Sequence, residues 1–189
     1  MTINTKILKN VALIIGLIAV AVGWRIINHD YQIAPNLEIV TSVSVIAAIV
    51  LGFRAAIIVP ISTMVISDLI IGNSSIFMFT WSSFAIIGIS ALLLRKLNKQ
   101  PKKQVLYSVG FAAVSSLLFF VVTNFGVWTQ GWYTMTWSGL VTCFTMAIPF
   151  YRATLIGNLI FVPASVTVWQ FVRAKQAAHS LVVDTLVRK

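Results

Sequence analysis

The chain is poor in the residues from which catalytic and metal sites are usually built. Its 189 residues include one cysteine, two histidines and four acidic residues. A single cysteine, Cys143, excludes an intrachain disulfide and a cysteine metal cluster. His29 and His179 lie too far apart in the sequence to suggest a pair of metal ligands. We therefore expect neither a metal site nor a cofactor.

Familiar catalytic motifs are also absent from the sequence. It contains no Gly-x-x-x-x-Gly-Lys-Ser/Thr phosphate loop, no Gly-x-Ser-x-Gly motif and no His-Glu-x-x-His pair. We find no convergent pair of catalytic side chains either. We therefore expect that the protein is not an enzyme, and that any ATP-driven step would need partner subunits.

What the chain has in abundance is apolar side chains. Hydrophobic residues make up 59% of it and charged residues only 10%, which predicts an integral membrane protein. A bilayer core of about 30 Å takes roughly 20 apolar residues per helix. The sequence therefore predicts an all-α bundle of six transmembrane helices in a single domain over residues 1–189, with spans near 7–24, 37–53, 55–71, 76–94, 104–123 and 152–172.

The connections between these spans differ in character. Gly52-Phe53-Arg54 predicts a tight helical hairpin, and Pro60 is expected to bend the helix that follows. Residues 95–103 form the only strongly polar connector, and we see no repeat between the two halves that it separates. Residues 138–150 are expected to form a short helix before the last span, either lying at the membrane surface or dipping into it.

The formal net charge of +10 is better explained by membrane topology than by nucleic acid. The basic residues collect at alternate loops: Arg25 and Arg152 lie on one side of the predicted bundle and the other twelve on the opposite side. Under the positive-inside rule this distribution predicts a multi-pass protein of the plasma membrane with both termini in the cytoplasm. We expect the bilayer, and no nucleic acid, to be its surroundings.

The first span allows two further interpretations. Lys6 and Lys9, an apolar run and Ala19-Val20-Ala21 together resemble a signal peptide with its cleavage site. As a retained span, the segment instead presents small residues on one helix face. That face either packs against a neighbouring span of the same chain or docks a separate subunit. Its residues are Ala12, Gly16, Ala19 and Gly23.

The rare acidic residues gather on the outer side of this topology. Asp30 and Glu38 flank the first outer loop, Asp68 lies near the outer end of the third span, and only Asp184 is predicted to be cytoplasmic. Arg25 and Arg152 lie at the same level as the three outer acids. Opposite charges at one face of an apolar body indicate a polar pocket.

Asp68 and Glu38 differ in how well local structure explains them. Asn36 and Glu38 fit a helix N-cap followed by an acid in the first turn. Asp68 instead precedes a helix C-terminus, with Gly72 as the expected C-cap, and the helix dipole disfavours a negative charge there. We expect Asp68 either to contact a ligand or to form an internal ion pair with Arg25 or Arg152.

Aromatic residues are expected beside this pocket. Trp128, Trp132, Tyr133 and Trp137 form either an interfacial belt or a loop that stacks on a flat ligand and closes over it. Asn124 and Asn158 add neutral hydrogen-bonding groups. The candidate ligand-binding residues are thus Arg25, Asn36, Glu38, Asp68, Asn124, Trp128, Trp132, Arg152 and Asn158.

Residues 25–75, "RIINHDYQIAPNLEIVTSVSVIAAIVLGFRAAIIVPISTMVISDLIIGNSS", resemble the first half of the substrate-binding S components of energy-coupling-factor (ECF) transporters and of small uncharacterised membrane families related to them. The matching pieces are an arginine closing span one, Pro-Asn opening span two, and Ser-Asp-Leu with a nearby glycine closing span three. Residues 123–161 look like the second half of one such uncharacterised family. Relatives often carry an acid where this chain has Asn158.

This resemblance implies a function. S components capture a small molecule near the outer face, usually a water-soluble vitamin or its precursor, under the loops after spans one, three and five. They dock on a transmembrane coupling subunit driven by two ABC-type ATPases through small residues of span one, which here correspond to Ala12, Gly16, Ala19 and Gly23. The alternatives are a secondary transporter, which would place its polar groups at the bilayer midplane, and a non-transporting membrane scaffold, which would not need the outer charges.

Overall fold

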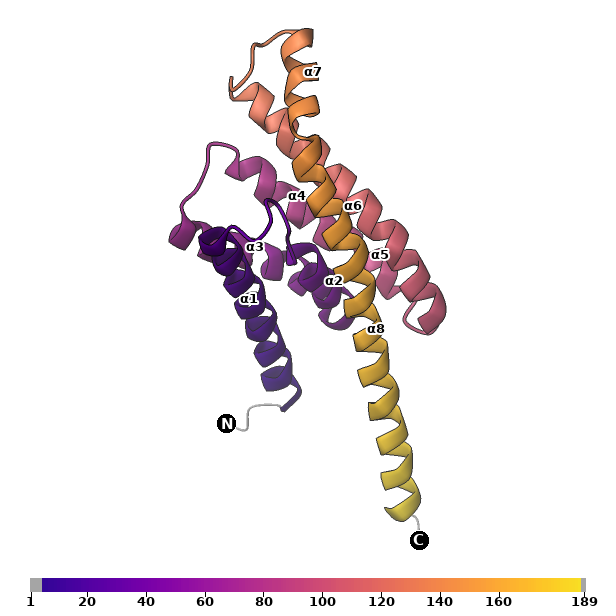
Figure 1. The fold of residues 1–189 in the computed structure, drawn as a ribbon. Coiled ribbons are helices and arrows are strands. Elements are labelled where there is room, and N and C mark those ends of the chain that lie inside the picture. Colours follow the sequence, from indigo (N-terminus) through magenta and orange to yellow (C-terminus); the bar gives the residue numbers. More distant parts are fainter. Residues whose placement is uncertain (1–4, 188–189) are drawn as a thin grey trace.

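The computed structural model describes residues 5–187, with side chains as far as residue 179, so the interpretation of Asp184, Arg188 and Lys189 falls outside what it describes. The described chain is all-helical (Figure 1), which confirms the expected fold class. Its elements are α1 (Thr5–Tyr31), α2 (Val40–Leu51), α3 (Phe53–Ile71), α4 (Phe77–Ser90), α5 (Leu92–Arg95), α6 (Pro101–Thr129), α7 (Trp137–Met146) and α8 (Ile148–Val187).

Five segments of the described chain are long and apolar enough to cross a membrane: α1, α3, residues Phe77–Arg95, α6, and residues Ile148–His179 of α8. The second of the six expected spans differs. Helix α2 has 12 residues, or about 18 Å at 1.5 Å per residue, which falls short of a bilayer core of about 30 Å. The structure therefore supports a multi-pass membrane protein with five spanning segments and one short apolar helix.

Helix α2 is short because the chain before it is irregular. Gln32 and Asn36 adopt left-handed backbone conformations with φ of 49° and 59°, and residues 32–39 form a loop. At its other end α2 stops at Gly52, whose φ is 93°. The Gly52 N–H bonds to the carbonyls of Ala47 and Ala48, and α3 follows at once. The expected tight hairpin at Gly52 is confirmed.

The short helix forms the centre of the bundle. It packs against α1, α3, α4, α5 and α8, and nine of its residues are buried. Val45, Ala48 and Ile49 join Val162 and Val166 of α8 in one apolar cluster. Close backbone approach also occurs between α3 and α4, where a side chain on Gly88 would meet the Ala56 carbonyl oxygen at 2.0 Å.

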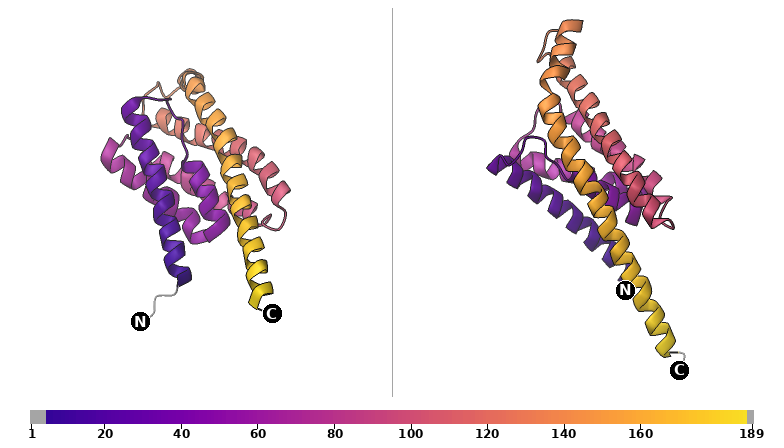
Figure 2. Two further views of the ribbon diagram at one scale, coloured as in Figure 1. Left: turned by 60° about the horizontal axis from the view of Figure 1, so that its bottom comes forward. Right: turned by 45° about the vertical axis from the view of Figure 1, so that its right-hand side comes forward.

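The start of α1 and the end of α8 lie at the same end of the bundle, and α8 extends beyond the other helices there (Figures 1 and 2). The loops 32–39, 72–76 and 130–136 lie toward the opposite end, which we call the loop end. Helix α7, the expected short helix before the last span, lies above this end and is followed directly by α8. The arrangement is compatible with termini on one side of a membrane.

Cysteine labelling tests the orientation that the charge distribution predicts. Cysteines introduced in place of Asp30 and Gln130, both exposed at the loop end, should react with an impermeant reagent added outside cells. A cysteine replacing the exposed Lys99 should react only after permeabilisation. The native Cys143 is buried and gives little background. External labelling at position 99 would contradict the predicted topology.

Candidate functional site

The rare charges of α1 and α3 form a partly buried ion pair at the loop end. Nη2 of Arg25 lies 2.6 Å from Oδ1 of Asp68, and Nε of Arg25 donates to the Ser67 hydroxyl at 2.6 Å. The second carboxylate oxygen of Asp68 accepts a hydrogen bond from the indole N–H of Trp81, on α4, at 2.7 Å. The side chains of Arg25 and Asp68 are 21% and 8% exposed. Three helices are thus tied together by one carboxylate.

This geometry decides between the partners expected for Asp68. Its ion pair is with Arg25, whereas Arg152 is exposed and forms no ion pair within the described side chains. Ser67 also donates to the Thr63 carbonyl at 2.7 Å, which fixes the hydroxyl that Arg25 contacts. Asp68 also lines a cavity. It therefore belongs to the candidate site as well as to the ion pair.

Three adjoining cavities occupy the loop end, and Asn36 and Phe119 line all three. We call them the aromatic cavity, of about 300 Å³, the Glu38 cavity, of about 220 Å³, and the Asp68 cavity, of about 460 Å³. Arg25 and His29 line both the Glu38 and the Asp68 cavities. The cavities are therefore neighbouring sections of one hollow.

The aromatic cavity is uncharged. No Asp, Glu, Lys, Arg or His lines it, and burial raises the pKa of the Cys143 thiol, which stays protonated and donates to the Asn124 carbonyl. Its hydrogen-bonding side chains are all neutral: Asn36, Asn124, three threonines, Cys143, Trp132 and the hydroxyls of two tyrosines. Its six rings are those of Phe119, Phe120, Trp132, Tyr133, Phe150 and Tyr151.

The Glu38 cavity contains a carboxylate that caps α2. The helix begins at Val40, so the expectation that Asn36 is its N-cap is wrong. Glu38 takes that role from outside the helix: its two oxygens accept from the Thr41 N–H at 2.8 Å and the Thr41 hydroxyl at 2.6 Å. Asn36 instead fixes the loop, since its carbonyl accepts from the Thr154 hydroxyl at 2.9 Å.

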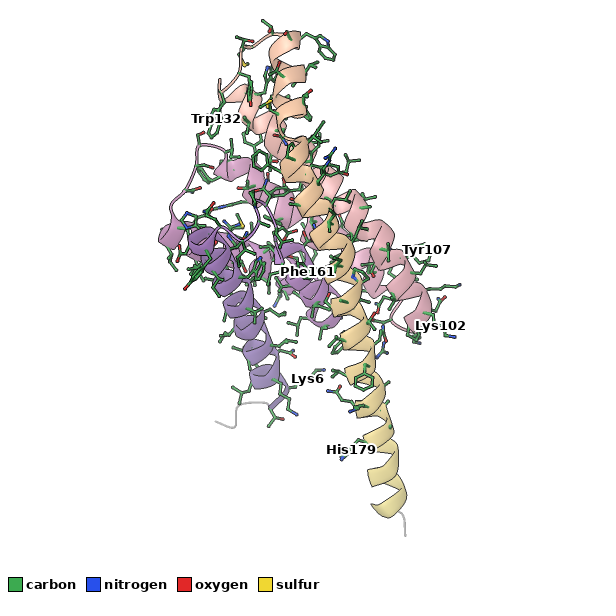
Figure 3. The ribbon with its side chains drawn as sticks, in the orientation of Figure 1. Lys6, Lys102, Tyr107, Trp132, Phe161 and His179 are labelled. Carbon is green, nitrogen blue, oxygen red and sulfur yellow. The ribbon has the colours of Figure 1, made fainter. Side chains whose placement is uncertain are left out.

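Two loops meet beside the aromatic cavity. The indole N–H of Trp132 donates to the Ser75 hydroxyl at 3.3 Å, which joins loop 130–136 to loop 72–76, and Figure 3 shows Trp132 near the loop end. Trp128 donates to the Thr134 carbonyl at 3.0 Å and holds its own loop without lining a cavity. This hydrogen bond between the two loops is exposed.

A family model covers almost the whole chain. Residues 5–181 match the family of unknown function DUF6580. The chain belongs to this family. No curated protein and no solved structure matches it.

The cavities of this DUF6580 protein include most, though not all, of the residues that the sequence singled out. The predicted residues that line them are Arg25, Asn36, Glu38, Asp68, Asn124 and Trp132. Arg152, Trp128 and Asn158 do not line them. Asn158 is 1% exposed and donates to the Ser116 hydroxyl at 3.1 Å inside the bundle. Trp137 is 77% exposed.

Sequence reasoning missed several residues that shape the hollow in this DUF6580 member. Trp81 binds Asp68 directly, and Phe119 lines all three cavities. Helix α1 contributes Asn28, whose side-chain amide donates to the carbonyls of Ala34 and Leu37 in the loop that follows, at 3.0 and 3.1 Å. Of these residues, only Asn28 could have been predicted from the sequence, because it lies one turn after Arg25 on the same helix face.

The small-residue face of α1 is not covered by the rest of the described chain. Ala12, Gly16 and Ala19 are exposed and Gly23 is half-buried. A Cβ added at Gly16 or Gly23 would meet nothing within 4 Å. The alternative that these residues pack against a neighbouring span of the same chain is therefore wrong, and the face is open to another molecule or to lipid.

Proposed function

We propose that this protein is a membrane-embedded capture subunit, related to the S components of ECF transporters, that binds a small water-soluble micronutrient such as a vitamin or its precursor. The observation that carries the proposal is the hollow at the loop end, which combines an uncharged cavity lined by six rings with polar sections next to a partly buried ion pair. Ligand sites are mostly apolar hollows with a few convergent polar groups.

The position of the hollow supports capture from one side of the membrane. Its lining comes from the C-terminal halves of α1, α3 and α6, the loop 32–39, the N-terminal half of α4, α7 and the first turns of α8, so it lies toward one end of the bundle. A secondary carrier would place its site nearer the midplane. With the termini in the cytoplasm, the hollow faces outward and the loops 72–76 and 130–136 flank its entrance.

The uncovered face of α1 supports the second half of the proposal, which is delivery to partners. Glycine and alanine allow close approach of another helix in a membrane, and Ala12, Gly16 and Ala19 are exposed on α1. We assign this face to a transmembrane coupling subunit that two ABC-type ATPases drive. In this scheme the protein itself performs no chemistry and needs no cofactor.

Purification from native membranes tests the proposal. A tagged protein extracted in mild detergent is expected to bring with it a coupling subunit and two ATPase subunits. Mass spectrometry of the denatured complex should reveal one retained small molecule in near-stoichiometric amount. Recovery of the tagged chain alone, from cells shown to contain ECF ATPases, would contradict the assignment to this transporter class.

A further inference from the structure

Glu38 is a buried carboxylate without a counter-ion. It is 8% exposed, and no Lys, Arg or His among the described side chains forms an ion pair with it. Buried carboxylates in proteins are normally paired because desolvation of an isolated charge costs several kcal/mol. Its two hydrogen bonds from Thr41 and the partial positive charge of about half a unit at the N-terminus of α2 compensate only part of the charge.

The other charges around the same hollow do not supply the missing cation. Arg25 lines the Glu38 cavity, but its guanidinium is held by Asp68 and Ser67. His29 also lines the cavity and bonds to Asp30 at 3.0 Å. With histidine counted as neutral, one positive charge on Arg25 and two negative charges on Asp68 and Glu38 give a formal net charge of −1 around the Glu38 and Asp68 cavities. Such a site repels carboxylates and phosphates and attracts cations.

The Glu38 carboxylate lies next to a cavity that suits a flat aromatic ring. The Glu38 cavity and the aromatic cavity share Asn36 and Phe119, so the two cavities adjoin at these two residues. A carboxylate that accepts one hydrogen bond on each oxygen keeps free lone pairs for an N–H donor. The ring faces of the aromatic cavity favour a planar group and also a neighbouring cation.

We infer that the ligand is an organic cation: an ammonium or similar positively charged N–H group bound by Glu38, attached to an uncharged aromatic ring that occupies the aromatic cavity. This inference rests on the proposed function, in that it names the chemical class of the captured molecule. It assigns Glu38 as the residue that selects the charge of the ligand. Anionic micronutrients are excluded from the site on this basis.

A matched set of indoles tests the charge preference. The purified full chain in an uncharged detergent is melted with tryptamine, tryptophol or indole-3-acetate, which share the ring and carry a positive, neutral or negative end. Tryptamine should stabilise the protein at concentrations about ten- to a hundredfold lower than tryptophol, as for a charge-assisted hydrogen bond, and indole-3-acetate should be weakest.

Two variants test whether Glu38 causes the preference for a positively charged ligand. Glu38→Gln keeps the shape of the side chain and removes its charge, so tryptamine and tryptophol should become about equal. Asp30→Asn removes the same charge from a nearby side chain that is 59% exposed and lines none of the three cavities, and it should keep the preference. If Glu38→Gln does not fold, the ranking of the three indoles on the unsubstituted protein decides.

Several outcomes overturn the inference. These are equal or stronger stabilisation by indole-3-acetate, no stabilisation by tryptamine up to its solubility limit, or loss of the preference in Asp30→Asn. Stabilisation by sodium chloride that choline chloride does not reproduce would assign the charge to an inorganic ion and overturn it as well. Co-purification of ATPase subunits is unaffected by these results, so the proposed function survives or fails separately.

Discussion

Leucine in place of Gly16 is expected to abolish ligand uptake by cells while the protein still folds and binds its ligand. A Cβ added at Gly16 meets no atom of the described chain within 4 Å and the position is exposed, so we expect the bundle to accommodate leucine. The same side chain fills the smooth face of α1 on which, in our proposal, a helix of the coupling subunit packs closely. Docking fails and the cavities at the loop end remain intact.

Two other glycines serve as controls for this experiment. Gly110 lies on an exposed part of α6 and also has nothing within 4 Å, so Gly110→Leu should leave uptake unchanged. Gly88 is the opposite case, because its side chain would meet the Ala56 carbonyl oxygen at 2.0 Å. Gly88→Leu should therefore melt early with no partner present. Normal uptake by Gly16→Leu, or equal loss in Gly110→Leu, would remove the support for a docking face.

The hydropathy of the sequence predicts which segments are helical and apolar, and α1, α3, α6 and α8 confirm it. It does not distinguish a helix that faces lipid from one enclosed by other helices, because both environments select apolar residues. Helix α2 is the case in point. Thr41, Ser42 and Ser44 on a short apolar run indicate enclosure rather than a span, and all three are buried.

The charged part of the site is predictable because charges are rare. With four acidic residues in the chain, each one near the ends of the predicted spans stands out, and Arg25, Glu38 and Asp68 do line the hollow. Whether Asp68 pairs with Arg25 or with Arg152 depends on which helices are neighbours, and the packing of α1 on α3 settles that. The sequence contains no equivalent information.

The aromatic part of the site is not predictable, because aromatic residues are common in this chain. Aromatic residues make up 12% of the chain, and a ring that faces lipid looks the same in the sequence as one that lines a cavity. Trp81 and Phe119 were missed in this way. Asn158 shows the converse error. Its polar side chain on a predicted span suggested a site residue, but it donates to Ser116 inside the bundle.

Asp68→Asn is expected to destabilise the protein strongly even without ligand, by about 3 kcal/mol, the lower part of the range for breaking a buried ion pair. The cost arises because Arg25, 21% exposed, keeps its charge and loses the carboxylate that compensated it. Asparagine retains an oxygen that accepts from Trp81, so α3 and α4 stay joined. Thermal melting of the purified variant in detergent measures the effect.

A double substitution separates the ion pair from the shape of the site. Arg25→Met alone should be destabilised to a similar degree, because Asp68 is then the unpaired charge. Arg25→Met combined with Asp68→Leu removes both charges, and well-packed apolar replacements of a buried pair are often close to neutral. The double variant should therefore recover most of the loss, and the difference from the sum of the single variants gives the coupling energy.

The same variants decide what Asp68 does for the ligand. If its charge serves only to hold α1 against α3, the double variant should still be stabilised by whichever compound stabilises the unsubstituted protein. A normal melt of Asp68→Asn together with loss of that stabilisation would contradict the ion-pair assignment and place the carboxylate in direct contact with the ligand. Because the Asp68 carboxylate is already paired with the Arg25 guanidinium at 2.6 Å, whereas Glu38 has no counter-ion among the described side chains, we expect Glu38 and not Asp68 to provide the ligand's charged contact.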